Sequence, residues 1–453
     1  MSFRRYIQKL ERDGKLIKIT APISKTHEIA ALMKHLEPQP VLFENVLESD
    51  FRVAGNICCT KGDFADYFGI SVSEIIPTLT RAIESPTPPT PSHRTLTGVL
   101  REGEEGAGAG GEIAPCQEVI CPEPDLTKLP ILRHFAGDGG DYITSGVFIA
   151  KHPVHGQNMD FHRGMILSPT EMAVRVVRGR HFDAFLQVLG QVDVAICIGN
   201  PPNVLAAAAT SVDIGVDELS IANALEPLQV VRAHSVDLLI PAQAEFVIEG
   251  TVYRDRRHAE GPFVDLTETQ DVIRSEPVFV VKAITHRKDA IWQALLPGAL
   301  EHKLLMGMPR EPTIFRKVNE VVRCLDVNIN PGGSSWLHAI VQIDKQSADD
   351  GAKAIHAAFA GHRSCKHVFV VDSDIDIYNP LEVEWAMATR FQGDRDMIVL
   401  AREPGSSLDP SAEPGTKLTT KIGFDLTAPV GKARRGYEKV PYPNVDNKRF
   451  VQA

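Results

Sequence analysis

The sequence predicts a mixed α/β protein with an N-terminal α/β region, a β-rich centre and a C-terminal α/β unit. Short apolar strands alternate with amphipathic helices over residues 1–84, and the same alternation returns after about residue 312. Strand-like segments and turns predominate between these regions, from about residue 113. The 453 residues allow two to three domains of about 150 residues each, and we place them at 1–112, 113–311 and 312–453.

Composition and charge exclude several classes of protein. Hydrophobic residues make up 43% of the chain, which is too many for a mainly disordered protein. The formal net charge of −10 argues against nucleic-acid binding, which usually needs a basic face. No apolar run is long enough to span a membrane, and the N-terminus lacks the apolar core of a secretory signal. The seven cysteines form no CxxC motif, so we expect reduced, mostly buried thiols in a cytoplasmic protein.

In the N-terminal region, apolar periodicity predicts helices and short strands. Phe3, Ile7 and Leu10 lie on one face of a helix at the start of the chain. Two strands and two further helices are expected after it, at residues 41–46, 52–56, 63–67 and 72–83. A proline-rich linker at 85–92 and a glycine-rich loop at 104–111 follow. The loop matches GxGxxG, but no strand precedes it and no helix follows it, so we reject a dinucleotide site.

The central region is expected to consist mainly of strands, at residues 142–151, 158–166, 192–199, 228–233 and 245–253. Helices are predicted between them, at residues 170–177, 182–189 and 201–209. In the C-terminal unit, strands alternate with helices, at residues 337–343, 348–360, 368–372 and 380–390. The stretch from Pro404 is rich in Pro, Gly and Lys, and we expect it to wrap the surface.

Three short segments carry side chains suited to chemistry, although the sequence has no HExxH, P-loop, GxSxG or EF-hand motif. Asn158–Arg163 puts an amide, a carboxylate, an imidazole and a guanidinium on one strand, and a solvated strand face is the alternative. Arg257–Asp265 carries two carboxylates, Glu260 and Asp265, around a Gly-Pro turn. They could divide acid and base roles, and an ordinary polar loop is the alternative. Gly215–Glu218 is typical of an acidic helix N-terminus.

Taken in order, these segments resemble the UbiD family of decarboxylases, which use prenylated FMN. The resemblance covers about residues 1–430. Asn158 and Arg163 match the family's spacing of Asn, four residues and Arg, and His181 in Gly-Arg-His-Phe matches its metal-binding His. Glu218 in Gly-Val-Asp-Glu matches its metal-binding Glu. Two further segments are similar to the family signature EIVLEG…EGPFGE/D: Glu245–Gly250 and Glu260–Asp265.

The resemblance implies that the chain binds prenylated FMN with Mn²⁺, or Mg²⁺, and K⁺. Asn158, His181 and Glu218 would bind the divalent ion, since an amide oxygen, an imidazole and a carboxylate suit Mn²⁺ or Mg²⁺. K⁺ would contact Glu218 and backbone carbonyls of residues 208–212. Lys421 would contact the cofactor phosphate, and a surface lysine is the alternative. The residues expected to line the cofactor are Asn158, Met159, Asp160, Phe161, His162, Arg163, Arg180, His181, Glu218 and Lys421.

The resemblance also implies catalytic roles for Arg163, Glu260 and Asp265. Decarboxylation of an unsaturated carbon leaves a carbanion that no side chain delocalises, so the cofactor must be the electron sink. In the family, the prenylated flavin forms a covalent adduct with the substrate, and carbon dioxide leaves. Asp265 would then protonate the adducted carbon, while Glu260 would pair with Arg163 near the substrate carboxylate. Asp265 is a shorter acid than the Glu of some family members.

The family resemblance sets one condition on the strand that carries Asn158 and Arg163, and it suggests three further residues near the cofactor or substrate. Strand alternation puts Asn158 and Arg163 on opposite faces, so both can face one cofactor only if the strand bulges or ends between them. Arg180 stands where other members carry a neutral residue, which places a cation near the cofactor or the substrate tail. His302 and Arg310 lie where the family lines its pocket and could recognise a second polar or anionic substrate group. A structural role in orienting their loop is an equal alternative.

We therefore expect a cytoplasmic, UbiD-like, non-oxidative decarboxylase, acting in one or both directions on an aromatic, heteroaromatic (furan, pyrrole or indole) or α,β-unsaturated carboxylic acid. By resemblance, the central domain would be a split β-barrel that holds the flavin. The C-terminal domain would mediate a homodimer or homohexamer, and a flavin prenyltransferase would supply the cofactor. The alternative is an FMN-dependent oxidoreductase on a similar barrel, which would use plain FMN with NAD(P)H and would not need the two carboxylates.

Overall fold

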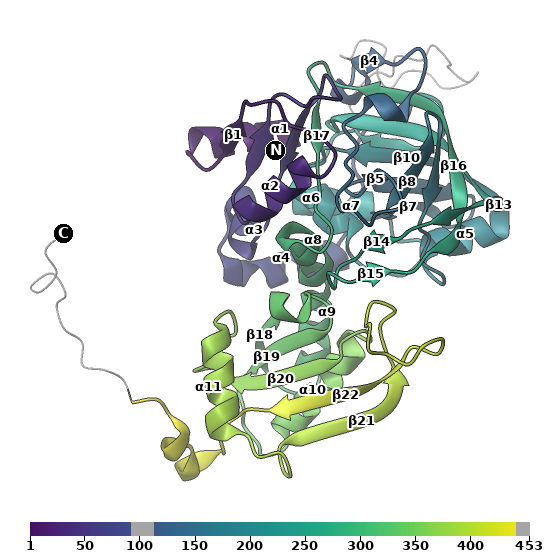
Figure 1. Cartoon of the computed structure of the whole chain (residues 1–453). Helices are drawn as coiled ribbons and strands as arrows, with labels where there is room; N and C mark the ends of the chain where they lie inside the picture. The colour runs from purple at the N-terminus through teal and green to yellow at the C-terminus, as the bar shows by residue number, and fades with distance from the viewer. Residues whose placement is uncertain (92–112, 441–453) are drawn as a thin grey trace, which may run out of the picture. The chain divides into compact units, whose positions relative to one another are not determined.

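The computed structural model describes residues 1–91 and 113–440, which form a mixed α/β fold (Figure 1). The glycine-rich segment 104–111, with its GxGxxG match, lies outside the described residues. The chain divides into two compact units. The first consists of Met1–Thr313, Ile329–Leu337 and Ser406–Lys417. The second consists of Ile314–Asn328, His338–Gly405 and the residues from Leu418 onward.

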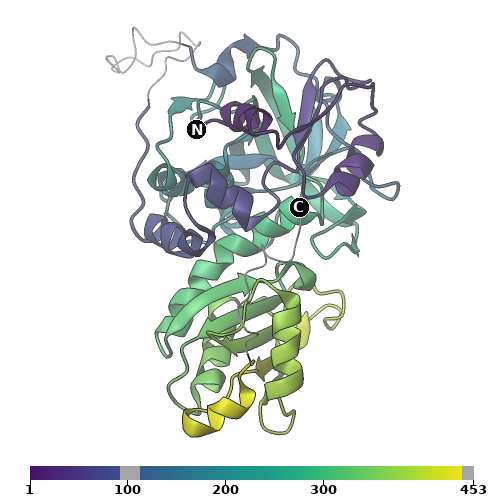
Figure 2. The ribbon, with the colours of Figure 1, turned by 90° about the vertical axis from the view of Figure 1, so that its left-hand side faces the viewer.

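The first unit begins with helices beside a small four-stranded sheet (Figure 2). Phe3, Ile7 and Leu10 are buried on one face of the first helix, as the sequence periodicity predicts. The helices are α1 (Phe3–Arg12), α2 (Glu28–Leu36), α3 (Lys61–Phe68) and α4 (Ile75–Glu84). The strands, in spatial order, are β1 (Ile17–Ile19), β2 (Val41–Phe43), β3 (Arg52–Gly55) and β17 (Ile291–Gln293).

A nine-stranded antiparallel sheet forms the centre of the first unit (Figure 1). Its path is β5-β8-β9-β16-β13-β10-β6-β7, and β4 pairs with β16 outside this path. The strands are β4 (Val119–Ile120), β5 (Tyr142–Ile143), β6 (Val147–His152), β7 (Gly156–Phe161), β8 (Gly164–Ser168), β9 (Glu171–Val174), β10 (Gln191–Ile198), β13 (Phe246–Glu260) and β16 (Arg274–His286). The mixed α/β class is confirmed, with a central sheet that is open rather than closed into a full barrel.

Apolar side chains cover both faces of this sheet. Val194 and Ala195, neighbours in β10, enter two different cores because successive strand residues point to opposite faces. The first core includes phenylalanines of α5 (His181–Leu189), and the second is filled by α6 (Pro202–Ala208) and α7 (Glu218–Leu225). This packing fixes the helices against the sheet and so determines where their first residues lie.

Shorter elements complete the first unit. Two strand pairs are formed by β11 (Val230–Arg232) with β12 (Leu239–Pro241), and by β14 (Phe263–Val264) with β15 (Gln270–Asp271). The boundary between the two units falls in α9 (Glu311–Asn319), which follows α8 (Leu300–Gly307). The 3₁₀ turns of the chain are η1 (Val72–Glu74), η2 (Pro115–Gln117), η3 (Leu126–Lys128), η4 (Met308–Arg310), η5 (Pro331–Gly333) and η6 (Gly431–Tyr437).

The second unit is a five-stranded sheet with helices, as the alternation after residue 312 predicts. Its strand order is β18-β19-β20-β22-β21, and β20 pairs in parallel with both β19 and β22. The strands are β18 (Cys324–Ile329), β19 (His338–Ile343), β20 (His367–Asp372), β21 (Met397–Pro404) and β22 (Leu418–Asp425). The helices are α10 (Asp350–Gly361) and α11 (Pro380–Arg390).

Several sequence-based expectations are wrong, and the single strands expected at 142–151 and 158–166 are each two strands. Residues 170–177 do not form a helix, because Glu171–Val174 is strand β9, paired with β8 and β16. Met172 and Ala173 favour helices in isolation, but strand pairing and complete burial override this weak propensity. The stretch from Pro404 does not simply wrap the surface, because it contains β22, which pairs with both β20 and β21.

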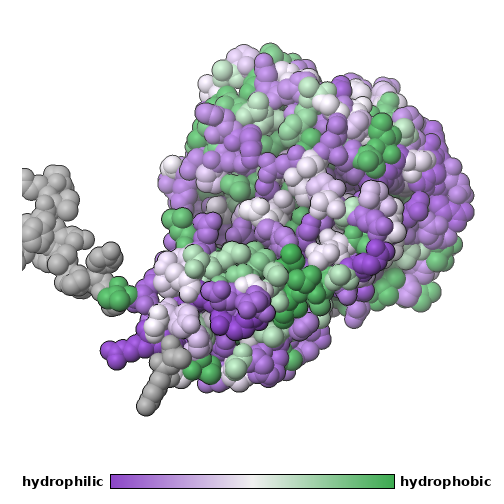
Figure 3. All heavy atoms as spheres, turned by 60° about the horizontal axis from the view of Figure 1, so that its bottom comes forward, coloured by the Kyte–Doolittle hydropathy of each residue, from purple (hydrophilic) through white to green (hydrophobic). Residues whose placement is uncertain are grey.

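Polar and apolar residues mix on the surface, and the cysteines are the mostly buried thiols that the sequence predicts. Figure 3 shows one face of the molecule, on which hydrophobic residues lie in separate spots among hydrophilic ones. Within residues 1–91 and 113–440, no helix is both long and apolar enough to cross a membrane. All seven cysteines are free thiols, and only Cys121 is not buried.

Candidate active site

The three predicted metal ligands come together from three separate elements of the first unit. Asn158 lies in β7, while His181 and Glu218 are the first residues of α5 and α7. Oδ1 of Asn158 lies 3.0 Å from Nδ1 of His181. Glu218 accepts a hydrogen bond of 2.8 Å from the backbone N–H of Met159, the residue after Asn158. Folding therefore places the Asn158 amide against the His181 imidazole, and the Glu218 carboxylate against the backbone next to Asn158.

The environment of Glu218 fits a bound cation. Its side chain is buried, and this burial raises its pKa to about 8, with Asp160 and Asp217 adding to the effect. No Lys, Arg or His of the described chain forms an ion pair with it. A divalent ion held by Asn158, His181 and Glu218 would neutralise the buried carboxylate and suits this donor set.

The predicted trio is not a cluster of acidic, imidazole and thiol groups alone. In the part of the chain that the structure describes, no three His, Cys, Asp or Glu residues form a group that could hold a metal ion. The predicted trio differs from such a group because one of its ligands, Asn158, is an amide. The trio therefore stays a prediction that the burial and charge of Glu218 support.

The other residues of β7 and its end mostly serve packing. Met159 is buried in the second apolar core, and Phe161 packs against that core. His162 packs against two phenylalanine rings, and its Nδ1 lies 3.0 Å from the carbonyl oxygen of Arg175. Burial lowers the pKa of His162, but Asp160, whose Oδ1 lies 2.9 Å from Nε2, outweighs this and raises the pKa above its ordinary value. Their contact with a cofactor stays a prediction.

The three predicted catalytic residues form one ion-paired cluster in the first unit. Arg163 donates to Glu260 twice, from Nε to Oε1 at 2.8 Å and from Nη2 to Oε2 at 3.1 Å. Nη1 of Arg163 donates to Oδ2 of Asp265 at 2.7 Å. The Glu260 side chain is completely buried, and that of Arg163 is 9% exposed. Burial lowers the pKa of Arg163, but the surrounding carboxylates outweigh this and raise it above its ordinary value.

The local chain path explains how these side chains meet. Strand β7 ends before Arg163, which lies between β7 and β8. The condition set by the sequence is therefore met, since the strand ends between Asn158 and Arg163. Glu260 is the last residue of β13, and Gly261, at a φ of +105°, turns the chain toward β14 and Asp265. Glycine adopts this positive φ without the steric cost that other residues have.

Aromatic rings and a neighbouring loop support the cluster. The guanidinium carbon of Arg163 lies 4.3 Å from the centre of the Phe263 ring, which itself packs against Tyr142 with ring centres 4.5 Å apart. The loop before β5 approaches from another side, where Gly139 donates its backbone N–H to the carbonyl of Pro262 at 2.8 Å. The turn between Glu260 and Asp265 is thus held from outside by packing and by a backbone hydrogen bond.

A further carboxylate, which sequence reasoning missed, completes the cluster. Nη2 of Arg163 donates to Oδ2 of Asp271 at 3.1 Å, and Arg274 donates to the same oxygen. Asp271 lies in β15, opposite Phe263 of β14. The Asp-x-x-Arg spacing of Asp271 and Arg274 was the available signal. It indicates a local ion pair, but it does not reveal that the pair reaches Arg163.

His302, a candidate substrate-binding residue, lies in α8. Its Nδ1 accepts a hydrogen bond of 3.0 Å from the backbone N–H of Gly298. Burial lowers the pKa of His302, the Asp265 carboxylate raises it and the Arg163 guanidinium lowers it further. The charges of the Arg163 cluster therefore act on His302, although Nδ1 of its ring is already hydrogen-bonded to its own loop.

Arg310 and Arg180 are two cations of the first unit, and the charge of Arg180 acts on Arg310. Arg310 stacks over the ring of Trp336 at 5.4 Å, and its Nε is buried without a hydrogen-bond partner. Burial lowers the pKa of Arg310 to about 10, and the charge of Arg180 adds to this effect. Arg180 precedes α5 and donates to the hydroxyl of Ser211 at 3.4 Å. Among the described residues, no carboxylate pairs with Arg310, so the pair is suited to an anion.

Lys421 lies in β22 of the second unit. It is 5% exposed, so the alternative of a surface lysine does not hold. Its Nζ donates to the carbonyl of Arg363 at 2.6 Å and lies 5.4 Å from the centre of the Phe359 ring, and burial lowers its pKa. Its contact with a cofactor phosphate stays a prediction, as does a K⁺ site at residues 208–212, where α6 ends.

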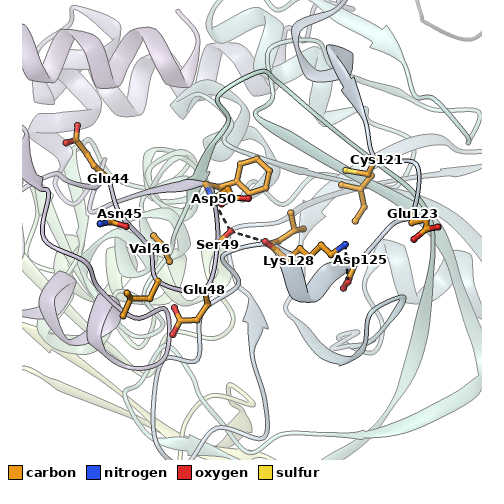
Figure 4. A pocket seen from close by; sticks show the side chains of 14 residues that line it. Glu44, Asn45, Val46, Glu48, Ser49, Asp50, Cys121, Glu123, Asp125 and Lys128 are labelled. Carbon is orange, nitrogen blue, oxygen red and sulfur yellow. Dashed lines mark hydrogen bonds and ion pairs between the residues drawn. The ribbon is translucent and has the colours of Figure 1, made fainter.

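A separate cavity of about 820 Å³ opens in the first unit between loops at 44–51 and 121–129 (Figure 4). Its lining is acidic, with carboxylates at Glu44, Glu48, Asp50, Glu123 and Asp125 and one cation at Lys128. Ser49 of one loop donates to the backbone carbonyl of Lys128 in the other at 2.9 Å. No predicted site residue lines this cavity, so it is distinct from the candidate active site.

Sequence comparison decides the family. Models of three domains of 3-octaprenyl-4-hydroxybenzoate carboxy-lyase match the chain in order: the N-terminal domain at residues 7–83, the Rift-related domain at 110–300 and the C-terminal domain at 303–426. The chain belongs to the UbiD family. The family expected from the sequence is thus confirmed, and the chain is a UbiD-class decarboxylase, a carboxy-lyase.

Relatives and solved structures agree with this assignment. Anhydromevalonate phosphate decarboxylase of Methanothermobacter thermautotrophicus is 40% identical over 441 residues, covering 95% of this chain and 98% of the relative. Its counterpart in Methanosarcina mazei is 39% identical over 434 residues, covering 94% and 96%. HmfF, a UbiD-class enzyme of Pelotomaculum thermopropionicum solved with FMN, superposes with a TM-score of 0.92 at 33% identity and full coverage of both chains. An evolved dimeric form of HmfF, solved with prFMN, has a TM-score of 0.86 at 32% identity, covering 100% of this chain and 98% of that one.

Proposed function

We infer that this UbiD-class decarboxylase uses prenylated FMN to release carbon dioxide from an α,β-unsaturated, aromatic or heteroaromatic carboxylic acid. The observation that carries the proposal is the buried cluster in which Arg163 is hydrogen-bonded to Glu260 and Asp265. A guanidinium can bind a substrate carboxylate, and a nearby acid can supply the proton that replaces the lost carboxyl group. An FMN-dependent oxidoreductase, the alternative function, would not need this cluster.

The residues of the site fit the cofactor that the family uses. Prenylated FMN, when bound, would supply the electron sink that decarboxylation of an unsaturated carbon requires. Asn158, His181 and Glu218 would hold the accompanying Mn²⁺ or Mg²⁺, because they supply an amide, an imidazole and a buried carboxylate. K⁺ beside Glu218 and a contact from Lys421 to the cofactor phosphate are further parts of the proposal, drawn from the family resemblance.

Each residue of the cluster has a distinct role in the proposal. Arg163 would hold the substrate carboxylate, and Glu260, which binds Nε and Nη2, would fix the plane of the guanidinium. Asp265, which shares Nη1, would pass a proton to the carbon that loses carbon dioxide. The charges of Asp265 and Arg163 both act on the pKa of His302, which stays a candidate substrate contact.

A second anionic group on the substrate is favoured by Arg310 and Arg180. The buried Nε of Arg310 has no partner, and the neighbouring charge that acts on it is another guanidinium. Arginine pairs bind phosphate and carboxylate groups through several hydrogen bonds. Two relatives at about 40% identity are named for anhydromevalonate phosphate. We therefore place an unsaturated acid that carries a phosphate first among the substrates.

The proposal extends to partners. A flavin prenyltransferase would supply the cofactor, and the chain would form a homodimer or homohexamer in the cytoplasm. A UbiD-class relative has been solved in an evolved dimeric form, which supports an assembly of identical chains. Light scattering of the purified protein would give the number of subunits.

Co-expression with a flavin prenyltransferase tests the proposed function. The purified enzyme is offered anhydromevalonate phosphate and a panel of furan, pyrrole, indole, benzoic and acrylic acids, and carbon dioxide release is measured. We expect release from at least one acid, and none when the prenyltransferase is omitted. Turnover of NAD(P)H by the protein loaded with plain FMN, with no carbon dioxide release from any acid, would favour the oxidoreductase instead.

A further inference from the structure

The guanidinium of Arg163 has few free donors. An arginine side chain carries five N–H groups, one on Nε and two on each Nη. Glu260 takes the Nε–H and one N–H of Nη2, Asp271 takes the other N–H of Nη2, and Asp265 takes one N–H of Nη1. A single N–H, on Nη1, remains for a substrate carboxylate.

Asp271 is itself held in place from several directions. Its Oδ2 accepts from Arg163 at 3.1 Å and also from Arg274, while its Oδ1 accepts the backbone N–H of Val272 at 2.9 Å. The side chain is 15% exposed. Burial raises the pKa of Asp271, but the two guanidiniums outweigh this and lower it below its ordinary value. Asp271 is therefore a fixed, charged anchor beside Arg163.

We propose that Asp271 is a positioning residue, which binds the second N–H of Nη2 and thereby aims Nη1 of Arg163 at Asp265 and the substrate carboxylate. This inference rests on the proposed function, in which Arg163 holds that carboxylate. Glu260 fixes one edge of the guanidinium plane with two hydrogen bonds, and Asp271, from the β14–β15 hairpin, adds a third hydrogen bond. With both anchors in place, the one free N–H and Asp265 share a single nitrogen, so substrate and proton donor are brought side by side.

The positive charge of Arg274 allows Asp271 to hold Arg163 without weakening the binding of the substrate carboxylate. Glu260, Asp265 and Asp271 place three carboxylates around Arg163, which on its own balances only one of them. Arg274 forms an ion pair with the same oxygen of Asp271 and so adds a second positive charge to the cluster. The excess negative charge that a substrate carboxylate would meet is reduced accordingly.

The test compares Asp271→Asn with the wild-type enzyme, both co-expressed with a flavin prenyltransferase and assayed on an acid that the wild type decarboxylates. Asparagine keeps the shape of the side chain but removes its charge. We expect kcat to fall about tenfold or more, because Nη1 of Arg163 is no longer held toward Asp265 and the substrate carboxylate. We expect KM to stay level or fall severalfold, because the site becomes more positive and binds the substrate anion more strongly. Loss of folded enzyme alone would lower apparent kcat at unchanged KM, so kcat is expressed per molecule of folded, flavin-bound enzyme.

Asp193→Asn serves as the matched control. Asp193 also accepts hydrogen bonds from a cation and a neutral side chain, Lys282 at 2.8 Å and Thr251 at 2.6 Å, but lies outside the cluster. We expect its kcat and KM to match those of the wild type. An Asp271→Asn enzyme with kcat within twofold of the wild type, or with a raised KM at unchanged kcat, would overturn the proposal.

A second measurement needs neither cofactor nor substrate. In a crystal structure of Asp271→Asn, we expect the guanidinium of Arg163 to turn, so that the contact of 2.7 Å between Nη1 and Asp265 is lost or shared between conformers. An unchanged guanidinium would contradict the positioning role even if no acid in the panel were decarboxylated. If Asp271→Asn does not fold, Asp271→Ala removes the same carboxylate, and an unchanged kcat and guanidinium there would overturn the proposal.

Discussion

Glu260 is a completely buried carboxylate that forms a two-fold hydrogen-bonded pair with Arg163. Substitution by glutamine keeps its size but removes the charge that fixes the guanidinium. We expect kcat of Glu260→Gln to fall on the order of 100-fold, because a buried pair loses one partner and the substrate-binding cation is no longer held. Carbon dioxide release by the co-expressed enzyme measures this.

Glu276→Gln is the control for that substitution. Glu276 also accepts from a guanidinium, that of Arg175 at 2.9 Å, and its side chain is 6% exposed, yet it makes no contact with Arg163. We expect it to lower thermal stability while leaving kcat within a few-fold of the wild type. Full activity in Glu260→Gln would show that Glu260 has no part in catalysis.

Removal of the divalent ion tests Asn158, His181 and Glu218 together. We expect dialysis of the co-expressed enzyme against EDTA to weaken flavin binding by about tenfold or more, because the buried carboxylate of Glu218 loses its counter-charge. Flavin absorbance that remains with the protein after gel filtration measures the loss, and added Mn²⁺ should restore it. Flavin retention that is unaffected by EDTA would contradict the metal trio.

At the scale of elements, the site depends on how the loop before β5 packs against the turn that joins Glu260 to Asp265. A Cβ added to Gly139 would lie 2.3 Å from the carbonyl oxygen of Gly261, which is backbone and cannot move aside. We expect Gly139→Ala to destabilise the protein by about 1–3 kcal/mol and to lower kcat, because the turn must shift. Urea unfolding and the decarboxylation assay measure the two effects.

Gly137→Ala is the matched control in the same loop. Its added Cβ would meet only the side-chain nitrogen of Gln270, at 3.0 Å, and this flexible end can move. We expect stability and kcat close to those of the wild type. Equal behaviour of Gly137→Ala and Gly139→Ala would mean that the loop does not position the turn.

At the scale of the whole molecule, the chain forms two compact units rather than a simple succession of segments. The first unit contains the residues predicted as the first two domains, and it also takes in Ile329–Leu337 and Ser406–Lys417. Trp336, from the first of these returning segments, stacks with Arg310 and donates its ring N–H to Ser406 of the second. The division into domains at 1–112, 113–311 and 312–453 stays a prediction.

Global stability should depend on pH through His134, which is buried with neither ring nitrogen hydrogen-bonded. Burial lowers its pKa to about 3, and Asp138 at 4.0 Å does not offset this. Below about pH 6.5 the unfolded chain gains a proton there that the folded chain excludes, so the free energy of unfolding falls as pH falls. Between pH 6.5 and 5 this residue contributes a loss of about 2 kcal/mol, measurable by urea unfolding.

Comparison with His134→Gln isolates that contribution. The variant cannot take up the proton, so its free energy of unfolding should fall about 2 kcal/mol less than that of the wild type between pH 6.5 and 5. His35→Gln, at an exposed position of α2, should keep the wild-type pH dependence. Parallel curves for the wild type and His134→Gln would show that His134 is protonated in the folded protein.

Much of the fold and the site could be predicted from the sequence, and the failures have physical causes. Strand β10 and helix α11 were predicted within a residue or two, because each shows a clear apolar run or period. Strand β9 was mistaken for a helix, because its residues favour helices locally and only pairing with β8 and β16 makes them a strand. Strand β22 was hidden in a segment whose composition is typical of a surface tail.

The sequence by itself determined the family and the decarboxylase class, and it predicted Arg163, Glu260 and Asp265 as catalytic candidates, because motif spacing can be read along the chain. The resemblance implied that Glu260 pairs with Arg163. Tertiary structure alone decided that Asp265 and Asp271 also bind Arg163 and that β7 ends before it. The reason is that a charged cluster depends on the direction of each side chain in space. Strand ends, turns and core packing set that direction. They bring together residues that are far apart in the sequence, and no sequence pattern predicts such a contact.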